Sequence, residues 1–138
     1  MKRIILGLVV ALFVLAACGG NEKEAKAKDK YEKTKESLEQ TEKKNPLRFL
    51  TLEGHDRKNL VRKTVITGVI TNKAKVASYK DIDVEISFYS KTGTLLMRDH
   101  EMIYETIDPG SSQDFKTKIR APKDSDSVGI KIVRAKAK

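Results

Sequence analysis

A strict alternation of apolar and polar residues from Asp81 to Phe88 constrains this chain more than any other feature. In an extended segment Ile82, Val84 and Ile86 face the same side as Phe88, and the residues between them face the other side. A period of two is incompatible with an amphipathic helix, whose faces repeat every 3.6 residues. The alternation therefore predicts a half-buried strand of an antiparallel sheet.

Other segments after residue 46 show similar patterns, and turn residues separate them. Glycine or proline marks two turns, Lys91-Thr92-Gly93 and Asp108-Pro109-Gly110. Further strands are predicted at Leu47–Leu52, Val61–Thr71, Thr94–Ile107, Phe115–Ile119 and Val128–Ile132. We expect six or seven short strands and no helix in residues 46–138. This predicts an all-β domain, a small immunoglobulin-like antiparallel β-sandwich.

The N-terminal end has a different character. Lys2 and Arg3 precede a continuous run of apolar and small residues from Ile4 to Ala17. The run is short for a membrane-spanning helix, which needs roughly 20 residues. Its length and basic start are typical of a signal peptide, which we place at residues 1–17. The only cysteine, Cys18, follows directly, so no internal disulfide can form.

The run ends in Leu15-Ala16-Ala17-Cys18, which resembles the lipobox of bacterial lipoproteins. The resemblance implies that signal peptidase recognises Leu15, Ala16 and Ala17 and cuts before Cys18. It also implies a diacylglyceryl group on the thiol and an acyl chain on the freed amine, which together anchor a protein stably. Because Gly19 and not Asp follows, it implies the outer membrane in a Gram-negative cell, and otherwise the outer face of the cell membrane. An ordinary secretory signal with a chance cysteine is the alternative.

Residues 18–45 form a charged segment between the lipid attachment site and the sandwich. Lys and Glu dominate it, and no apolar stripe runs along it. Opposite charges recur four residues apart, as in Asp29–Lys33 and Glu39–Lys43, and such pairs support an isolated helix. We expect a solvated, partly helical spacer that ends before Pro46, since the residue preceding a proline disfavours helix.

The sandwich region also resembles a known family. The resemblance is carried by Gly68-Val69-Ile70-Thr71-Asn72, then Tyr79 to Tyr89, then Gly93-Thr94-Leu95-Leu96, then Ile107-Asp108-Pro109-Gly110-Ser111-Ser112, then Phe115. These segments are similar to the FxLYD type of bacterial extracytoplasmic domain. The similarity spans about Thr64 to Val133, and Ser90 replaces the family's usual Asp after Phe-Tyr. It implies an envelope-exposed β-sandwich without general catalytic activity.

The formal net charge of +9 restricts the choice of partners. No aromatic residues interleave the basic clusters, so a nucleic-acid partner is not expected. Anionic envelope polymer or lipid headgroups fit an exported basic chain better, and solubility is the plain alternative. Candidate anionic-ligand contacts gather in two clusters: Arg57, Lys58, Arg62 and Lys63, and Lys131, Arg134, Lys136 and Lys138.

Two side-chain groups suggest metals weakly. His100 and Met102 share a strand face, and imidazole with thioether suits copper, so a periplasmic copper carrier is a minor hypothesis. Asp81, Asp83 and Glu85 form an acidic row, but neighbours on one strand face lie too far apart to share a calcium ion. We expect lysines on an adjacent strand to pair with this row.

No nucleophile elbow or phosphate-binding loop is present, so we expect no enzyme and no cofactor beyond the lipid. The leading hypothesis is a membrane-anchored lipoprotein that acts as a non-catalytic interaction or accessory module in the cell envelope. It would bind an envelope protein whose identity the sequence does not reveal, through strand edges or loops. Binding of anionic polymer or headgroups is the alternative.

Overall fold

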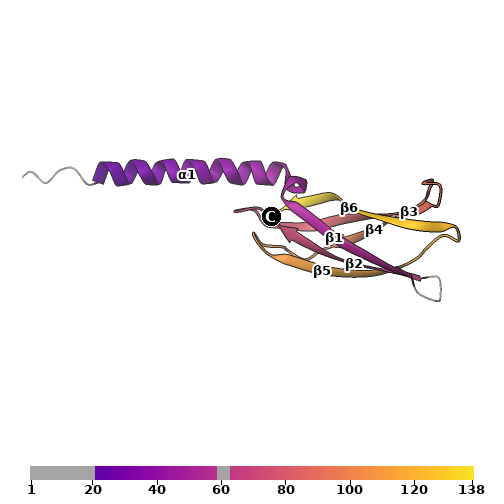
Figure 1. Cartoon of the computed structure of the whole chain (residues 1–138). Helices are drawn as coiled ribbons and strands as arrows, with labels where there is room; N and C mark the ends of the chain where they lie inside the picture. The colour runs from indigo at the N-terminus through magenta and orange to yellow at the C-terminus, as the bar shows by residue number, and fades with distance from the viewer. Residues whose placement is uncertain (1–20, 59–62) are drawn as a thin grey trace, which may run out of the picture.

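The computed structural model describes residues 21–58 and 63–138. A long helix, α1 (Asn21–Lys44), projects from one end of a β domain (Figure 1). The helix ends just before Asn45-Pro46, as predicted. Pro46 then begins a single 3-10 turn, η1 (Pro46–Arg48), because its fixed φ and missing N–H suit the first position of a helical turn.

Within the described residues, six strands form two three-stranded antiparallel sheets that face each other. The first sheet has the order β1-β2-β5 and the second the order β4-β3-β6. Their bounds are β1 Leu50–Lys58, β2 Lys63–Asn72, β3 Tyr79–Ser90, β4 Leu95–Ile103, β5 Ser112–Arg120 and β6 Ser125–Ala137. The prediction of an all-β fold, a small antiparallel β-sandwich, is confirmed.

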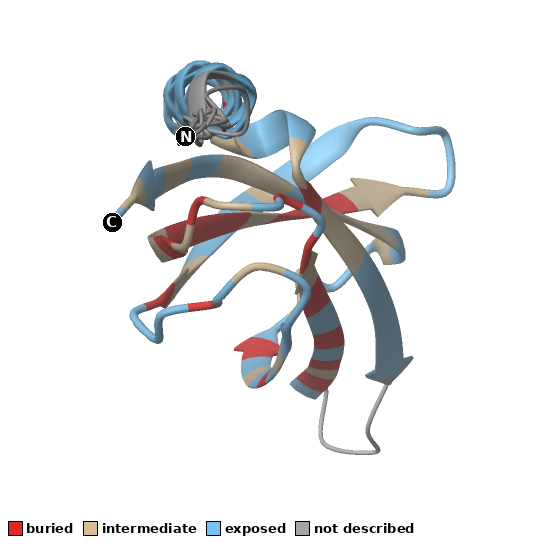
Figure 2. Cartoon of the chain, turned by 90° about the vertical axis from the view of Figure 1, so that its left-hand side faces the viewer, coloured by how far each residue is buried: buried red, intermediate tan, exposed pale blue. Residues whose placement is uncertain are grey.

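The core lies between the facing sides of the two sheets. The alternating side chains of β3 are fully buried there: Ile82, Val84, Ile86 and Phe88. Ile66 and Ile70 of β2 cover them from the opposite sheet. Burying each such side chain contributes about 1.5–3 kcal/mol. Figure 2, which looks along the helix, shows buried residues on the strands while α1 stands outside the sandwich.

A glycine in β2 makes room for an aromatic side chain of the core. Phe115 of β5 lies directly opposite Gly68 in the register, and a Cβ at Gly68 would collide with the Phe115 ring. The ring therefore packs against the bare backbone of the neighbouring strand. Glycine also serves the two predicted turns, where Gly93 has a φ of 83° and Gly110 a φ of 75°.

Several strand predictions were inaccurate in their bounds. The strands β5 and β6 extend beyond the predicted Phe115–Ile119 and Val128–Ile132 at both ends, and two other predictions differ more. The segment Thr94–Ile107 was expected to be one strand, but β4 stops at Ile103, and Ile107 forms an isolated bridge with Tyr79. The expected opening strand Leu47–Leu52 is also shifted, because Leu47 belongs to η1 and β1 runs from Leu50 to Lys58. The second half of β1 is mostly polar and exposed, so its sequence carries no apolar alternation.

Candidate functional site

The lipobox residues Leu15, Ala16, Ala17 and Cys18 lie outside the described residues, as does Arg62. Of the first basic cluster, Arg57 and Lys58 end β1 and Lys63 begins β2, so the structure places them at one end of the sandwich. Arg57 and Lys63 are exposed. This end is opposite the one from which α1 projects (Figure 1).

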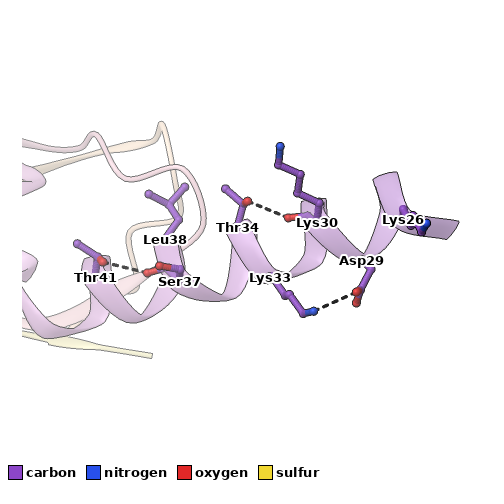
Figure 3. A pocket seen from close by; sticks show the side chains of 8 residues that line it. All are labelled: Lys26, Asp29, Lys30, Lys33, Thr34, Ser37, Leu38 and Thr41. Atoms are coloured by element: carbon purple, nitrogen blue, oxygen red, sulfur yellow. Dashed lines mark hydrogen bonds and ion pairs between the residues drawn. The ribbon is translucent and has the colours of Figure 1, made fainter. Parts of the chain in front are cut away.

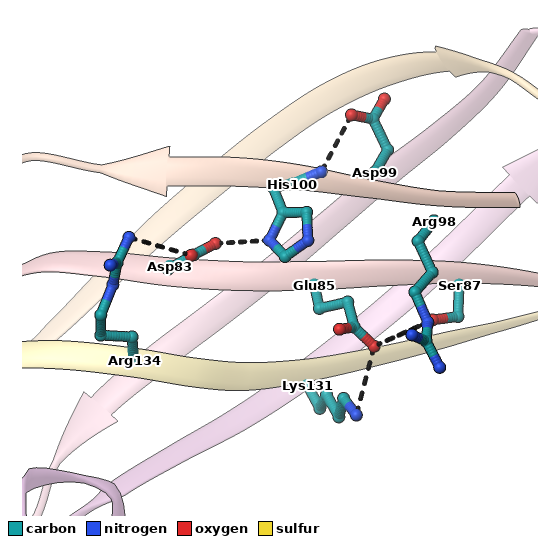
Figure 4. Close-up of polar contacts among 8 residues, drawn as sticks. All are labelled: Asp83, Glu85, Ser87, Arg98, Asp99, His100, Lys131 and Arg134. Carbon is teal, nitrogen blue, oxygen red and sulfur yellow. Dashed lines mark hydrogen bonds and ion pairs between the residues drawn. The ribbon is translucent and has the colours of Figure 1, made fainter.

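Three members of the second basic cluster lie on β6, and their side chains pair with the acidic row of β3. Lys131 Nζ lies 3.2 Å from Glu85, Arg134 Nη2 lies 3.4 Å from Asp83, and Lys136 Nζ lies 3.2 Å from Asp81. Figure 4 shows the first two pairs on the outer face of the second sheet. The expected pairing of the acidic row with lysines on an adjacent strand is confirmed for Asp81 and Glu85, and Asp83 pairs with an arginine of the same strand. The last member, Lys138, donates its backbone N–H to the carbonyl of Ser78.

A basic side chain of the other neighbouring strand, β4, also lies near the carboxylate of Glu85. Arg98 Nε of β4 lies 3.7 Å from its carboxylate, and the Ser87 hydroxyl donates a hydrogen bond at 3.2 Å. The Lys131 hydrogen bond contributes most to holding the pKa of Glu85 below its usual value, and it outweighs the opposing effect of desolvation. The outer face of this sheet is therefore a set of mutually satisfied charges.

The weak copper candidates His100 and Met102 lie on the same outer face. His100 Nδ1 is 2.8 Å from Asp83 Oδ1, and Met102 is directly opposite Asp83 in the register. Within residues 21–58 and 63–138, no three His, Cys, Asp or Glu side chains are grouped so that they could hold a metal ion. The observed partner of the imidazole is thus a carboxylate that Arg134 also contacts.

A feature that sequence reasoning missed lies where α1 meets the sandwich. Glu42, in the last turn of the helix, is only 1% exposed. Its carboxylate accepts three backbone hydrogen bonds, each 2.9 Å long, from the N–H groups of Lys75, Val76 and Ala77 in the β2–β3 loop. We call this arrangement the Glu42 clasp. The prediction of a solvated spacer is wrong at this residue.

A second contact joins the same parts of the molecule. The Tyr79 hydroxyl, at the start of β3, donates a 2.9 Å hydrogen bond to the backbone carbonyl of Glu42. Tyr79 is fully buried. Burial and, to a lesser degree, the negative charge of Glu42 raise the pKa of Tyr79 to about 12, so the phenol stays a donor at neutral pH.

The protonation state of Glu42 follows from the balance of two effects. Burial is the largest single influence and by itself raises the pKa of this carboxyl. The three backbone N–H groups, with a smaller contribution from the charge of Lys75, together outweigh it and leave the pKa below the usual 4.5. Glu42 is therefore ionised at neutral pH, when its bonds to the loop are strongest.

The loop that holds Glu42 is itself held by a buried amide. Asn72, at the end of β2, donates from Nδ2 to the carbonyls of Ala77 and Ile107, and its Oδ1 accepts the N–H of Ala74. Asn72 is fully buried. Its side chain therefore fixes the β2–β3 loop in the shape that presents its amides to the helix.

Two hollows flank the exposed part of α1. One, of about 570 Å³, is lined by Tyr31, Thr34, Lys35 and Leu38 of the helix with Lys75 and Val76 of the loop. The other, of about 640 Å³, runs along the helix surface (Figure 3). The hydroxyls of Thr34 and Thr41 donate to the carbonyls four residues earlier, so they are used within the helix.

No helix among the described residues is long and apolar enough to cross a membrane.

Comparisons with known proteins add little. No family model matches the chain, and no curated protein matches it significantly. The resemblance to the FxLYD type therefore stays a resemblance. Among solved structures, the Salmonella enterica trimeric lipoprotein SadB matches with a TM-score of 0.43 and 14% identity, covering 81% of this chain and 75% of that chain. At that TM-score and identity the likeness establishes neither a shared fold nor a shared function.

Proposed function

We propose that this chain is a lipid-anchored, non-catalytic accessory protein of the bacterial cell envelope that presents a β-sandwich to a protein partner. The Glu42 clasp is the observation that carries the proposal, because it makes the spacer a fixed arm. The lipobox motif ending at Cys18 supplies the predicted anchor, only three residues before α1 begins.

The geometry suits presentation at a set distance from a membrane. A helix of 24 residues is about 36 Å long. A flexible linker of that size would let the domain sample many orientations, and each binding event would then cost ordering entropy. With the helix fixed to the sandwich by Glu42 and Tyr79, the sandwich extends away from the N-terminal end of α1, next to which the proposed anchor lies in the sequence (Figure 1).

Crosslinking in intact cells tests this proposal, comparing the wild-type chain with Cys18→Ala and Glu42→Ala. We expect the wild type to capture a defined envelope protein, Cys18→Ala to lose it, and Glu42→Ala to capture less of it. Glu39→Ala is the matched control, since Glu39 lies on the same helix and pairs only with Lys43 at 2.7 Å. Equal capture by the wild type and by Cys18→Ala would contradict a function that depends on the membrane anchor.

A further inference from the structure

The outer face of the first sheet carries a basic surface to which the sequence pointed only in part, through Arg57 and Lys63. In the register of β1, β2 and β5, Arg57 and Lys118 flank Val65 on one row, and Lys63 lies directly opposite Arg120 on the next. Lys116 follows on β5. All of these cations are exposed. We call these five residues the basic face: Arg57, Lys63, Lys116, Lys118 and Arg120.

The basic face differs from the other basic surface of the sandwich in one respect. On the second sheet, the cations of β6 are each paired with a carboxylate of β3. Among the residues that the structure describes, no carboxylate lies within ion-pair distance of a cation of the basic face. The fold neutralises its positive charge on one sheet and leaves it available on the other.

The clustering of cations on this face destabilises the sheet locally. Like charges directly opposite each other on antiparallel strands destabilise a sheet, and Lys63 and Arg120 are such a pair. The acidic residues of this face lie elsewhere, since Glu53 and Asp114 flank Val69, two rows nearer the helix than Arg57 and Lys118. Positive charge is therefore concentrated at the end of the face that is remote from α1 (Figure 1).

We infer that the basic face binds a linear polyanion of the cell envelope with regularly spaced phosphate groups. Along a strand, side chains on one face recur about every 7 Å, and strands two apart lie about 10 Å apart. The five cations thus form a flat grid, which a chain of phosphates can cross without entering a pocket. Arginine and lysine both bind phosphate, so all five side chains of the grid can contact the polymer.

The position of the face decides between two sources of phosphate. On the proposed function, the membrane lies at the far end of α1, and the basic face lies at the opposite end of the sandwich. Helix and strands together place it well over one Debye length, about 8 Å, from the headgroups to which the chain is anchored. The inference uses only this placement of the anchor and does not depend on the protein partner proposed above.

The test uses the full-length protein in detergent micelles and poly(glycerol phosphate) as the probe, with binding followed by fluorescence anisotropy. We expect binding that weakens steeply as salt is raised. The double variant Lys118→Glu, Arg120→Glu should weaken it at least tenfold. The matched control is Lys26→Glu, Lys30→Glu, which changes the net charge equally but lies on exposed α1, and it should bind nearly as the wild type does.

Folding is checked by urea unfolding. Arg120→Glu turns the opposed pair with Lys63 into an attractive one, so the midpoint should not fall. Equal weakening by both double variants would show that only net charge matters and would overturn the inference. Binding to phosphatidylglycerol vesicles but not to the polymer would also overturn it. If the protein does not bind the polymer but still captures a partner protein in cells, polymer binding by the basic face is refuted and the proposed function is not.

Discussion

A buried carboxylate is stable only where hydrogen bonds replace the water that it has lost. At Glu42 three backbone N–H groups do so, and no ion pair with a lysine or arginine within 4 Å contributes among the described residues. The free energy of the clasp therefore depends on the charge of one side chain. Protonation removes that charge and turns one oxygen into a donor that faces other donors.

Acid should therefore weaken the molecule through this residue. Because the pKa of Glu42 in the folded chain is below 4.5, its contribution to stability is complete above that pH and is lost as pH falls through the folded pKa. Glu42→Gln should lower the free energy of unfolding by about 3 kcal/mol at pH 7. Urea unfolding at a series of pH values should show the gap between wild type and variant closing below pH 4.5. A gap that is constant with pH would contradict this account.

At the scale of elements, the β2–β3 loop links strands, helix and core. Asn72 binds the loop at Ala74 and Ala77 and binds the β4–β5 connection at Ile107. The loop has no strand or helix of its own between Asn72 and Tyr79, so the buried amide replaces the regular hydrogen bonding that it lacks. The shape of the clasp thus depends on a residue that does not touch Glu42 directly.

Removing that amide should loosen both connections at once. Asn72→Ala leaves two carbonyls and one N–H without their present partner, and we expect a loss of about 2–3 kcal/mol in the free energy of unfolding, measured with urea. Asn45→Ala serves as the control, because Asn45 donates one exposed bond to Thr41. Similar losses for the two variants would show that the buried network of Asn72 has no special weight.

The strands were the most predictable elements, and the reason is local. The burial of Ile82, Val84, Ile86 and Phe88 follows from alternation within one segment. β1 was placed poorly because only its first residues reach the core, and the rest is exposed. The Glu42 clasp could not be predicted, since it joins segments that are remote in the sequence and uses amides that every residue except proline carries. Of the basic face, the sequence indicated Arg57 and Lys63 but not the residues of β5 that lie beside them in the sheet.

At the scale of the whole molecule, helix and sandwich behave as one body as long as the clasp holds. The contacts of Glu42 and Tyr79 lie at the base of an otherwise exposed helix, so a small rotation there moves its far end by many ångströms. The orientation of the sandwich relative to α1 is therefore set by very few hydrogen bonds.

Pulsed electron spin resonance can measure this orientation directly. Spin labels at Lys28→Cys and Lys123→Cys, in the full chain carrying Cys18→Ser, place one probe on α1 and one in the β5–β6 turn. We expect a narrow distribution of distances between them, and a clearly broader one once Glu42→Ala is added. Glu39→Ala should leave the distribution narrow. Equal widths for all three would show that the arm is held by contacts other than the clasp.

The Glu42 clasp also limits which substitutions this protein can accumulate. The helix recognises the loop through main-chain N–H groups, so the side chains of Lys75, Val76 and Ala77 donate none of the three hydrogen bonds to Glu42. Lys75 is exposed and can exchange one residue type for another at little cost, with proline as the exception. Ala77 is constrained by its burial in the core, and Glu42 tolerates almost no replacement. The donors of the joint are thus insensitive to side-chain identity whereas its acceptor is not, and descendants could diverge at exposed loop positions while keeping the same angle between helix and sandwich.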